Sequence, residues 1–105
     1  MTSKQRAYLR SLAQHTDPVI QIGKAGITPE LCEAVSEALE ARELIKINIL
    51  KNCFEDPREL ADTLSGRTRS EVVQLIGRKI VLYRPAREPV IVLPKTAKQV
   101  RSDER

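Results

Sequence analysis

The residues best suited to bind a charged ligand form one short turn, Gly23-Lys24-Ala25-Gly26, which holds two of the four glycines in this chain of 105 residues. The turn follows an apolar run, Pro18 to Ile22, and precedes Thr28-Pro29, a pair typical of a helix start. Such a strand, turn and helix N-terminus can bind an anion, because glycine lets a phosphate approach the main chain and the first helical N–H groups lack partners. Lys24 adds a mobile positive charge. Glycine also occurs in such turns for steric reasons alone, so the motif by itself favours neither interpretation.

The chain offers no catalytic constellation of comparable clarity. Its single histidine, His15, has Ser11 and Asp17 nearby in sequence, but nearness in sequence does not make a nucleophile, a base and an orienting acid. The turn at Gly23 also lacks the P-loop pattern GxxxxGK(S/T) and the dinucleotide pattern GxGxxG. We therefore expect a protein with no enzymatic activity, no small-molecule substrate and no cofactor.

Cysteine usage and hydropathy narrow the class of protein further. Cys32 and Cys53 are too far apart for a CxxC unit and, with one histidine, supply too few ligands for a closed zinc site. We expect no metal site, and free thiols in a reducing compartment. The apolar runs are too short to span a membrane, and the N-terminus lacks the apolar core of a signal peptide. These features predict a cytoplasmic protein that does not bind membranes.

Charge is distributed unevenly along the chain. The net charge is +4, yet Thr28 to Glu43 contains five glutamates and one arginine, which leaves 17 basic and 9 acidic residues, a charge of +8, elsewhere. Further basic residues lie on one face of the first predicted helix, at the tip of the last hairpin and at the end of its second strand: Arg6, Arg10, Arg78, Lys79, Arg84 and Arg87. Together with Lys24 they favour a phosphate-binding side opposed by an acidic helix. Because Tyr8, Phe54 and Tyr83 are the only aromatic residues and no RNP1 motif occurs, backbone recognition is favoured over a base-stacking platform.

Hydrophobic periodicity predicts three helices. The first extends from Ser3 to about Gln14. The second, from about Pro29 to Ala41, has an apolar stripe at helical spacing. Its other side carries an acidic stripe: Glu30, Glu33, Glu37 and Glu40. The third begins at the capping box Asp56 to Glu59 and is predicted to fray near Ser65-Gly66.

Alternating or β-branched apolar residues predict the strands Val19–Ile22, Leu44–Leu50, Val72–Ile76 and Lys79–Arg84, with a further short edge strand at Val90–Leu93. Gly77-Arg78 is a hairpin turn between two of them. The resulting order, α-β-α-β-α-β-β, predicts an α/β fold, a two-layer sandwich with a mixed four-stranded sheet. We expect the sheet to be largely parallel, with an antiparallel strand added by the last hairpin, and the helices to cover one face. At this length the chain forms one domain.

Several segments, in order, resemble one known family. They are LRSLA in the first helix, PVIQIGKAGIT, EALEARELIKINIL, QLIGRKIVLYRP and VIVLP, which together extend from about Ser3 to Pro94. The chain is similar to CRM domains, and in particular to the small single-domain bacterial members called the YhbY family. The resemblance implies a fold related to the C-terminal domain of bacterial initiation factor three. It also implies one RNA-binding domain over residues 1–94, followed by a charged tail over residues 95–105 that we expect to be mobile.

The resemblance further implies a function and a site. Bacterial members of the family associate with precursors of the large ribosomal subunit, so the implied partner is ribosomal RNA in assembling particles. Gly23, Lys24, Ala25 and Gly26 would form the family's GxxG RNA-contact loop, with contributions from Thr28, Arg6, Arg10, Arg78, Lys79 and Arg84. Two alternatives stay open: a general RNA chaperone without a ribosomal destination, and a protein-interaction module that docks through its acidic helix. We expect a monomer.

Overall fold

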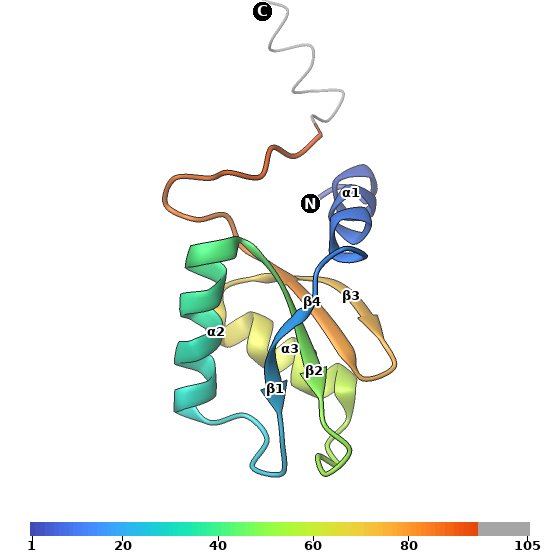
Figure 1. The fold of residues 1–105 in the computed structure, drawn as a ribbon, viewed down its shortest axis with the longest axis vertical. Helices are drawn as coiled ribbons and strands as arrows, with labels where there is room; N and C mark the ends of the chain where they lie inside the picture. The colour runs from blue at the N-terminus through green and yellow to red at the C-terminus, as the bar shows by residue number, and fades with distance from the viewer. Residues whose placement is uncertain (95–105) are drawn as a thin grey trace, which may run out of the picture.

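A computed structural model describes residues 1–94 of the chain, and the predicted mobility of the tail at residues 95–105 lies outside the described residues (Figure 1). The helices and strands follow the predicted order: α1 (Ser3–Ala13), β1 (Pro18–Ile22), α2 (Pro29–Arg42), β2 (Leu44–Ile49), α3 (Pro57–Thr68), β3 (Glu71–Ile76) and β4 (Lys79–Tyr83). The predicted α/β fold class with a mixed four-stranded sheet is confirmed. None of the helices in this described part is long and apolar enough to cross a membrane.

The four strands lie in the order β1-β2-β4-β3. Only β1 and β2 are parallel, with Ile20 opposite Ile47 and Ile22 opposite Ile49. β4 lies between β2 and β3 and is antiparallel to both. The expectation of a largely parallel sheet is therefore wrong. The reason is that β3 never pairs with β2: α3 carries the chain past β2 to the far edge, and the hairpin returns β4 into the gap.

The main hydrophobic core lies between one face of the sheet and the helices α2 and α3. Ile47 and Leu82 project from the central strands toward Leu39 of α2 and Leu64 of α3, and all four side chains are fully buried. These two helices and the sheet form the predicted two-layer sandwich (Figure 1). The strand β2 contributes alternate isoleucines to this core, as its period-two pattern predicts.

The expectation that helices cover only one face is wrong, because α1 packs on the other face. Leu9 and Ala13 of α1 form a second buried cluster with Leu44, Val81 and Tyr83 of the sheet. The two central strands are thus apolar on both faces near this end. The pattern LIKINIL conceals that property, since only its first residue, Leu44, reaches the second cluster.

The helix α3 does not fray near Ser65-Gly66 as predicted. It continues to Thr68, and Arg69 ends it in the left-handed conformation with φ at 56°. Thr68 is buried, and its hydroxyl donates a hydrogen bond to the Leu64 carbonyl at 2.7 Å. Tertiary burial of this last turn outweighs the weak helix propensity of Gly66.

The residues Val90–Leu93 do not form the predicted edge strand, because a buried glutamate binds their backbone. The Glu43 carboxylate accepts hydrogen bonds from the N–H groups of Val90 at 2.8 Å, Ile91 at 2.7 Å and Ala86 at 2.9 Å. Glu43 is only 2% exposed, so it is not part of the acidic surface of α2. Burial acts to raise its pKa, but the three hydrogen bonds outweigh burial and hold the pKa below its usual value. The segment after β4 is therefore tied to the end of α2 rather than to a strand.

Candidate nucleic-acid interface

The turn Gly23–Gly26 leaves the end of β1 and leads into α2. The Gly26 N–H donates to the Gly23 carbonyl at 3.0 Å, which closes the turn. Gly26 is buried with φ at 68°, a conformation that favours glycine, and a Cβ there would collide with the Glu55 carboxylate. Lys24 and Ala25 are exposed at the tip. One glycine is therefore required for the shape of the turn.

The turn presents unpaired donors next to a helix N-terminus. Thr28 is the N-cap of α2, as predicted, and its hydroxyl accepts from the Leu31 N–H at 3.1 Å. Within residues 1–94, no protein group accepts a hydrogen bond from the backbone N–H of Lys24 or Ala25. These two donors, the Lys24 ammonium and the positive end of α2 are what an anion such as phosphate requires.

Two other turns join the Gly23–Gly26 turn at the same end of the sheet (Figure 1). The Leu50 N–H donates to the Ile22 carbonyl at 2.9 Å, and the Ile49 N–H donates to the Arg78 carbonyl at 2.7 Å. A Cβ built on Gly23 would lie 3.8 Å from Oδ1 of Asn52. We call the three turns together, Gly23–Gly26, Leu50–Glu55 and Gly77–Lys79, the loop edge.

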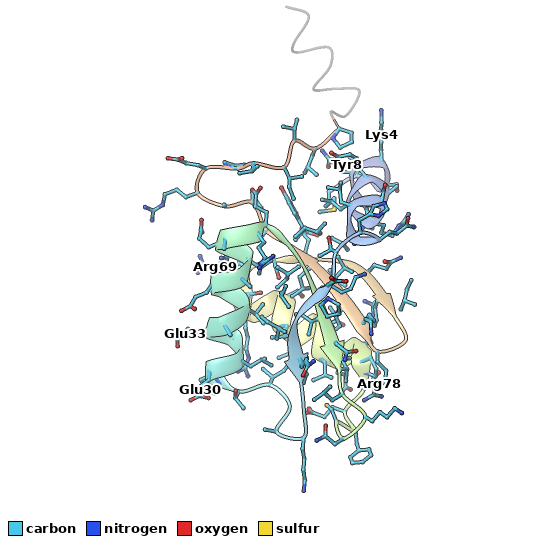
Figure 2. The ribbon with its side chains drawn as sticks, in the orientation of Figure 1. Lys4, Tyr8, Glu30, Glu33, Arg69 and Arg78 are labelled. Atoms are coloured by element: carbon cyan, nitrogen blue, oxygen red, sulfur yellow. The ribbon has the colours of Figure 1, made fainter. Side chains whose placement is uncertain are left out.

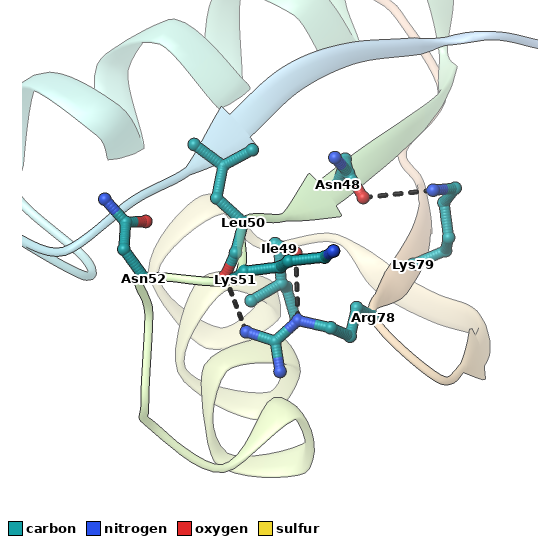
Figure 3. A pocket seen from close by; sticks show the side chains of 7 residues that line it. All are labelled: Asn48, Ile49, Leu50, Lys51, Asn52, Arg78 and Lys79. Atoms are coloured by element: carbon teal, nitrogen blue, oxygen red, sulfur yellow. Dashed lines mark hydrogen bonds between the residues drawn. The ribbon is translucent and has the colours of Figure 1, made fainter.

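Arg78 holds two of these turns together (Figure 3). Its guanidinium donates to the carbonyls of Ile49 at 3.1 Å, Leu50 at 2.6 Å and Cys53 at 2.6 Å. The neighbouring Lys79 is exposed and donates to Oδ1 of Asn48 at 3.0 Å. The structure thus brings both predicted residues to the loop edge, but it commits the Arg78 guanidinium to the protein backbone. Lys79 keeps two further ammonium protons for a ligand.

Charge differs on the two sides of the Gly23–Gly26 turn. On the side where Gly23 approaches Asn52, the two neighbouring turns form a pocket of about 630 Å³ that no residue of Gly23–Gly26 lines. Its lining, within the described part of the chain, has no carboxylate: Asn48, Ile49, Leu50, Lys51, Asn52, Arg78 and Lys79. The other side opens into a pocket of about 270 Å³ that contains two glutamates: Ala25, Ile27, Glu55, Glu59, Leu60, Thr63 and Arg67. A phosphate backbone that contacts the turn is favoured to continue along the first side.

Arg84 lies away from the loop edge and has a structural role. Its guanidinium donates to the Ser36 carbonyl at 2.8 Å, the Ser36 hydroxyl at 3.1 Å and the Thr68 carbonyl at 2.9 Å. It also lies 3.9 Å from the Glu40 carboxylate, with its side chain 21% exposed. Arg84 therefore links α2 to the end of α3, and few of its donors are left for RNA.

The arginines of α1 are not brought together with the turn. Figure 1 places α1 at the opposite end of the sheet from Gly23–Gly26. Arg6 is half-buried and donates to the Val72 carbonyl at 2.7 Å, whereas Arg10 is exposed. The acidic stripe of α2 is exposed as predicted, and Figure 2 shows Glu30 and Glu33 on its outer side.

Sequence reasoning missed the Leu50–Glu55 turn as part of the site. Lys51, Asn52 and Phe54 are exposed there, and Cys53 is buried as a free thiol. The segment has no local motif. The only signal that could have placed it is the pairing of β1 with β2, since parallel neighbours end at the same edge of a sheet.

The chain matches a known family over most of its length: the CRS1 / YhbY (CRM) domain matches residues 1–84. The chain belongs to this family, as its sequence indicated.

Named relatives agree with this assignment. The Bacillus subtilis protein named Probable RNA-binding protein YqeI is 47% identical over 88 residues, which cover 84% of this chain and 92% of that protein. A Haemophilus influenzae protein named RNA-binding protein is 34% identical over 95 residues, which cover 90% of this chain and 96% of that protein. The solution structure of a Staphylococcus aureus protein, described as a candidate RNA-binding protein, has a TM-score of 0.77 and 53% identity and covers 90% of this chain and 99% of that one.

Proposed function

We propose that this protein binds RNA, and that it assists assembly of the large ribosomal subunit by contacting the ribosomal RNA backbone through Gly23–Gly26. The observation that carries the proposal is the pair of N–H groups at Lys24 and Ala25 that have no acceptor within residues 1–94, next to the N-terminus of α2 and an exposed ammonium. Membership of the CRM family and the names of its relatives support RNA as the ligand. The protein acts by binding and catalyses no reaction, in the cytoplasm and as a monomer.

In this proposal the turn holds one phosphate, and the flanking pocket lined by Lys51 and Lys79 attracts the next. Backbone amides recognise the phosphate without regard to base identity, so binding through the turn is independent of sequence. Arg6, Arg10, Arg78 and Arg84 are not needed at this contact. We assign Arg10 at most a separate contact at the α1 end, and Arg6, Arg78 and Arg84 to the support of the fold.

The proposal predicts that Lys24→Ala weakens RNA binding and its salt dependence. Loss of one exposed charge should lower affinity about fivefold for all RNA sequences, and lower the slope of log affinity against log salt by about 0.7 to 0.9. Fluorescence anisotropy with labelled RNA at several salt concentrations measures both. The matched control is Lys4→Ala, which removes another exposed lysine, at the α1 end (Figure 2).

Gly23→Asp provides a second test of the turn. Gly23 has no close contact that a side chain would meet, so this variant should fold and place a carboxylate at the anion site. RNA affinity should then fall more than in Lys24→Ala. Wild-type affinity in both Lys24→Ala and Gly23→Asp would remove the turn from the interface.

The ribosomal destination is tested separately. Sedimentation of cell lysate should enrich the protein in fractions that hold precursors of the large subunit, and in-cell crosslinking should recover ribosomal RNA. Absence of that enrichment, with RNA binding intact, would favour a general RNA chaperone.

Glu33→Gln with Glu37→Gln neutralises part of the exposed acidic stripe of α2 and tests whether this helix docks a protein. If this change abolished association with the particle but left RNA affinity intact, the acidic helix would be the docking surface.

A further inference from the structure

Phe54 is 92% exposed, more than any other large apolar residue in residues 1–94. It is the only phenylalanine in the chain. Exposure of a single apolar residue is common and by itself indicates little. The position of Phe54 is what gives it significance, because the residues on both sides of it contact the other turns of the loop edge.

The backbone on either side of Phe54 is held in place. On one side, Cys53 is buried and its carbonyl accepts from Arg78 at 2.6 Å. On the other side, the Glu55 carboxylate lies against Gly26, where it would obstruct a Cβ. Asp56 then caps α3 by accepting from the Arg58 N–H at 3.1 Å. The aromatic ring therefore projects into solvent from a fixed base that directly adjoins the Gly23–Gly26 turn.

The surroundings of the ring suit a nucleobase better than a protein surface. Lys51, Asn52, Glu55 and Asp56 are its exposed neighbours in the chain, and all are polar. Protein docking sites generally place an aromatic anchor within a larger apolar centre, which these neighbours do not provide. A nucleobase presents an apolar face with a polar, charged backbone beside it, so a ring that follows the ammonium of Lys51 and the amide of Asn52 in the chain matches it. The two carboxylates on the other side of the ring have structural contacts, because Glu55 lies against Gly26 and Asp56 caps α3.

We propose that Phe54 stacks on one unpaired nucleobase of the RNA whose phosphate is held by the Gly23–Gly26 turn. This inference rests on the proposed RNA-binding function and narrows its ligand. A base inside a duplex has both faces covered, so only a bulge, loop or single-stranded segment can present one. The adjoining turn holds the phosphate, and Lys51 and Asn52 line the pocket without carboxylates along which the strand continues. Stacking accepts any base, which preserves sequence-independent binding.

The chain lacks tryptophan, so Phe54→Trp introduces a single fluorophore at the proposed contact. Titration with a single-stranded oligoribonucleotide should quench its emission. The RNA concentration at half-maximal quenching should equal the midpoint of the binding curve measured by anisotropy. Val92→Trp is the matched control, because Val92 is 80% exposed on the segment after β4. Its emission should not change on binding. Unchanged emission of the Phe54→Trp protein at saturation would overturn the proposal.

Affinity measurements provide an independent test. Phe54→Ala should lower affinity for single-stranded RNA about 5- to 150-fold, leave the salt slope at its wild-type value and leave affinity for a fully paired duplex unchanged. Phe54→Leu should behave like Phe54→Ala, since it keeps an apolar side chain but lacks an aromatic face, whereas Phe54→Tyr should restore binding. Because the ring is exposed, these variants should fold like the wild type.

The outcomes separate this inference from the function on which it rests. Wild-type affinity for single-stranded RNA in Phe54→Ala or in Phe54→Leu would overturn the stacking proposal. The proposed phosphate contact at Gly23–Gly26 would be unaffected by that result. A wild-type protein that binds neither single-stranded nor paired RNA would overturn the proposed function itself. Loss of a protein partner in Phe54→Ala, with RNA affinity unchanged, would also overturn the stacking proposal.

Discussion

Replacing Glu43 by glutamine tests whether one buried carboxylate holds the end of the described chain. Glu43→Gln keeps the shape of the side chain but exchanges one acceptor oxygen for an N–H₂ donor. In the wild type one oxygen accepts from Val90 and Ile91, and the other accepts from Ala86. Glutamine can keep the first pair of bonds, but its amide nitrogen must then face the Ala86 N–H.

The cost follows from these three bonds. Loss of the charge weakens each of the two retained bonds by about 1 kcal/mol, since hydrogen bonds to ionised groups are roughly twice as strong as neutral ones. Two opposed donors at Ala86 cost about 1 to 2 kcal/mol. Because glutamine is neutral, the variant avoids the cost of burying a charge, which offsets about 1 kcal/mol of this loss. We therefore expect Glu43→Gln to lower the free energy of unfolding by about 2 to 3 kcal/mol at neutral pH.

The pH dependence of stability gives a sharper signature. The folded-state pKa of Glu43 is held below its usual value of 4.5, so the unfolded chain takes up the proton more readily. Its contribution to stability is present above pH 4.5 and is lost as the pH falls through the lower, folded-state pKa. Urea unfolding followed by circular dichroism between pH 7 and acid should show that the difference between wild type and Glu43→Gln shrinks in this range.

Tyr83 provides an internal check. Burial raises the pKa of its hydroxyl, and the nearby charge of Glu43 raises it further. In Glu43→Gln the alkaline titration of Tyr83 should therefore shift toward its ordinary range. The matched control is Glu40→Gln: this exposed carboxylate accepts from the Arg87 N–H at 2.8 Å and should cost less than about 1 kcal/mol. The reasoning would be refuted if Glu43→Gln lowered the free energy of unfolding no more than Glu40→Gln does, or if the loss of stability in Glu43→Gln did not depend on pH.

Three further substitutions separate residues that shape the protein from residues that contact RNA. Gly26→Ala should cost about 1 to 2 kcal/mol, because it forces a side chain into the left-handed region next to Glu55, while Gly23→Ala should be nearly neutral; urea unfolding of the two variants compares them. Arg84→Ala should destabilise the fold by about 2 to 3 kcal/mol by leaving the carbonyls of Ser36 and Thr68 without this donor. It should leave the salt slope of RNA binding unchanged, and a reduced slope would instead show that Arg84 contacts phosphate.

Individual helices and strands could be predicted from the sequence because the residue patterns that indicate them are local. The apolar stripe, the N-cap Thr28 and Pro29 predicted α2, and the alternation of LIKINIL predicted β2. The same kind of local pattern, a strand, two glycines and a helix start, predicted that the Gly23–Gly26 turn could hold an anion, but it did not by itself decide between that role and a purely steric one. These patterns depend on neighbours within a few residues, so the chain alone carries them.

Tertiary structure decided which arginines are free and what surrounds the turn. The sequence presents Arg78 and Arg84 as surface charges like Lys79, and only the pairing of distant segments shows that their guanidinium groups bind backbone carbonyls. It presents Glu43 as one more acid of α2, although the segment 43 to 48 residues further on, from Ala86 to Ile91, contains the N–H groups that bind its carboxylate.

The same distinction applies to Phe54. In sequence it is one apolar residue in a polar loop. Only the pairing of β1 with β2 and the hydrogen bond from Arg78 to the Cys53 carbonyl place it beside Gly23–Gly26. Such contacts join segments about 30 residues apart and depend on the whole sheet, so neither segment shows them as a periodic pattern. The sequence determined the turn that can hold a phosphate, and the tertiary structure determined the ring beside it.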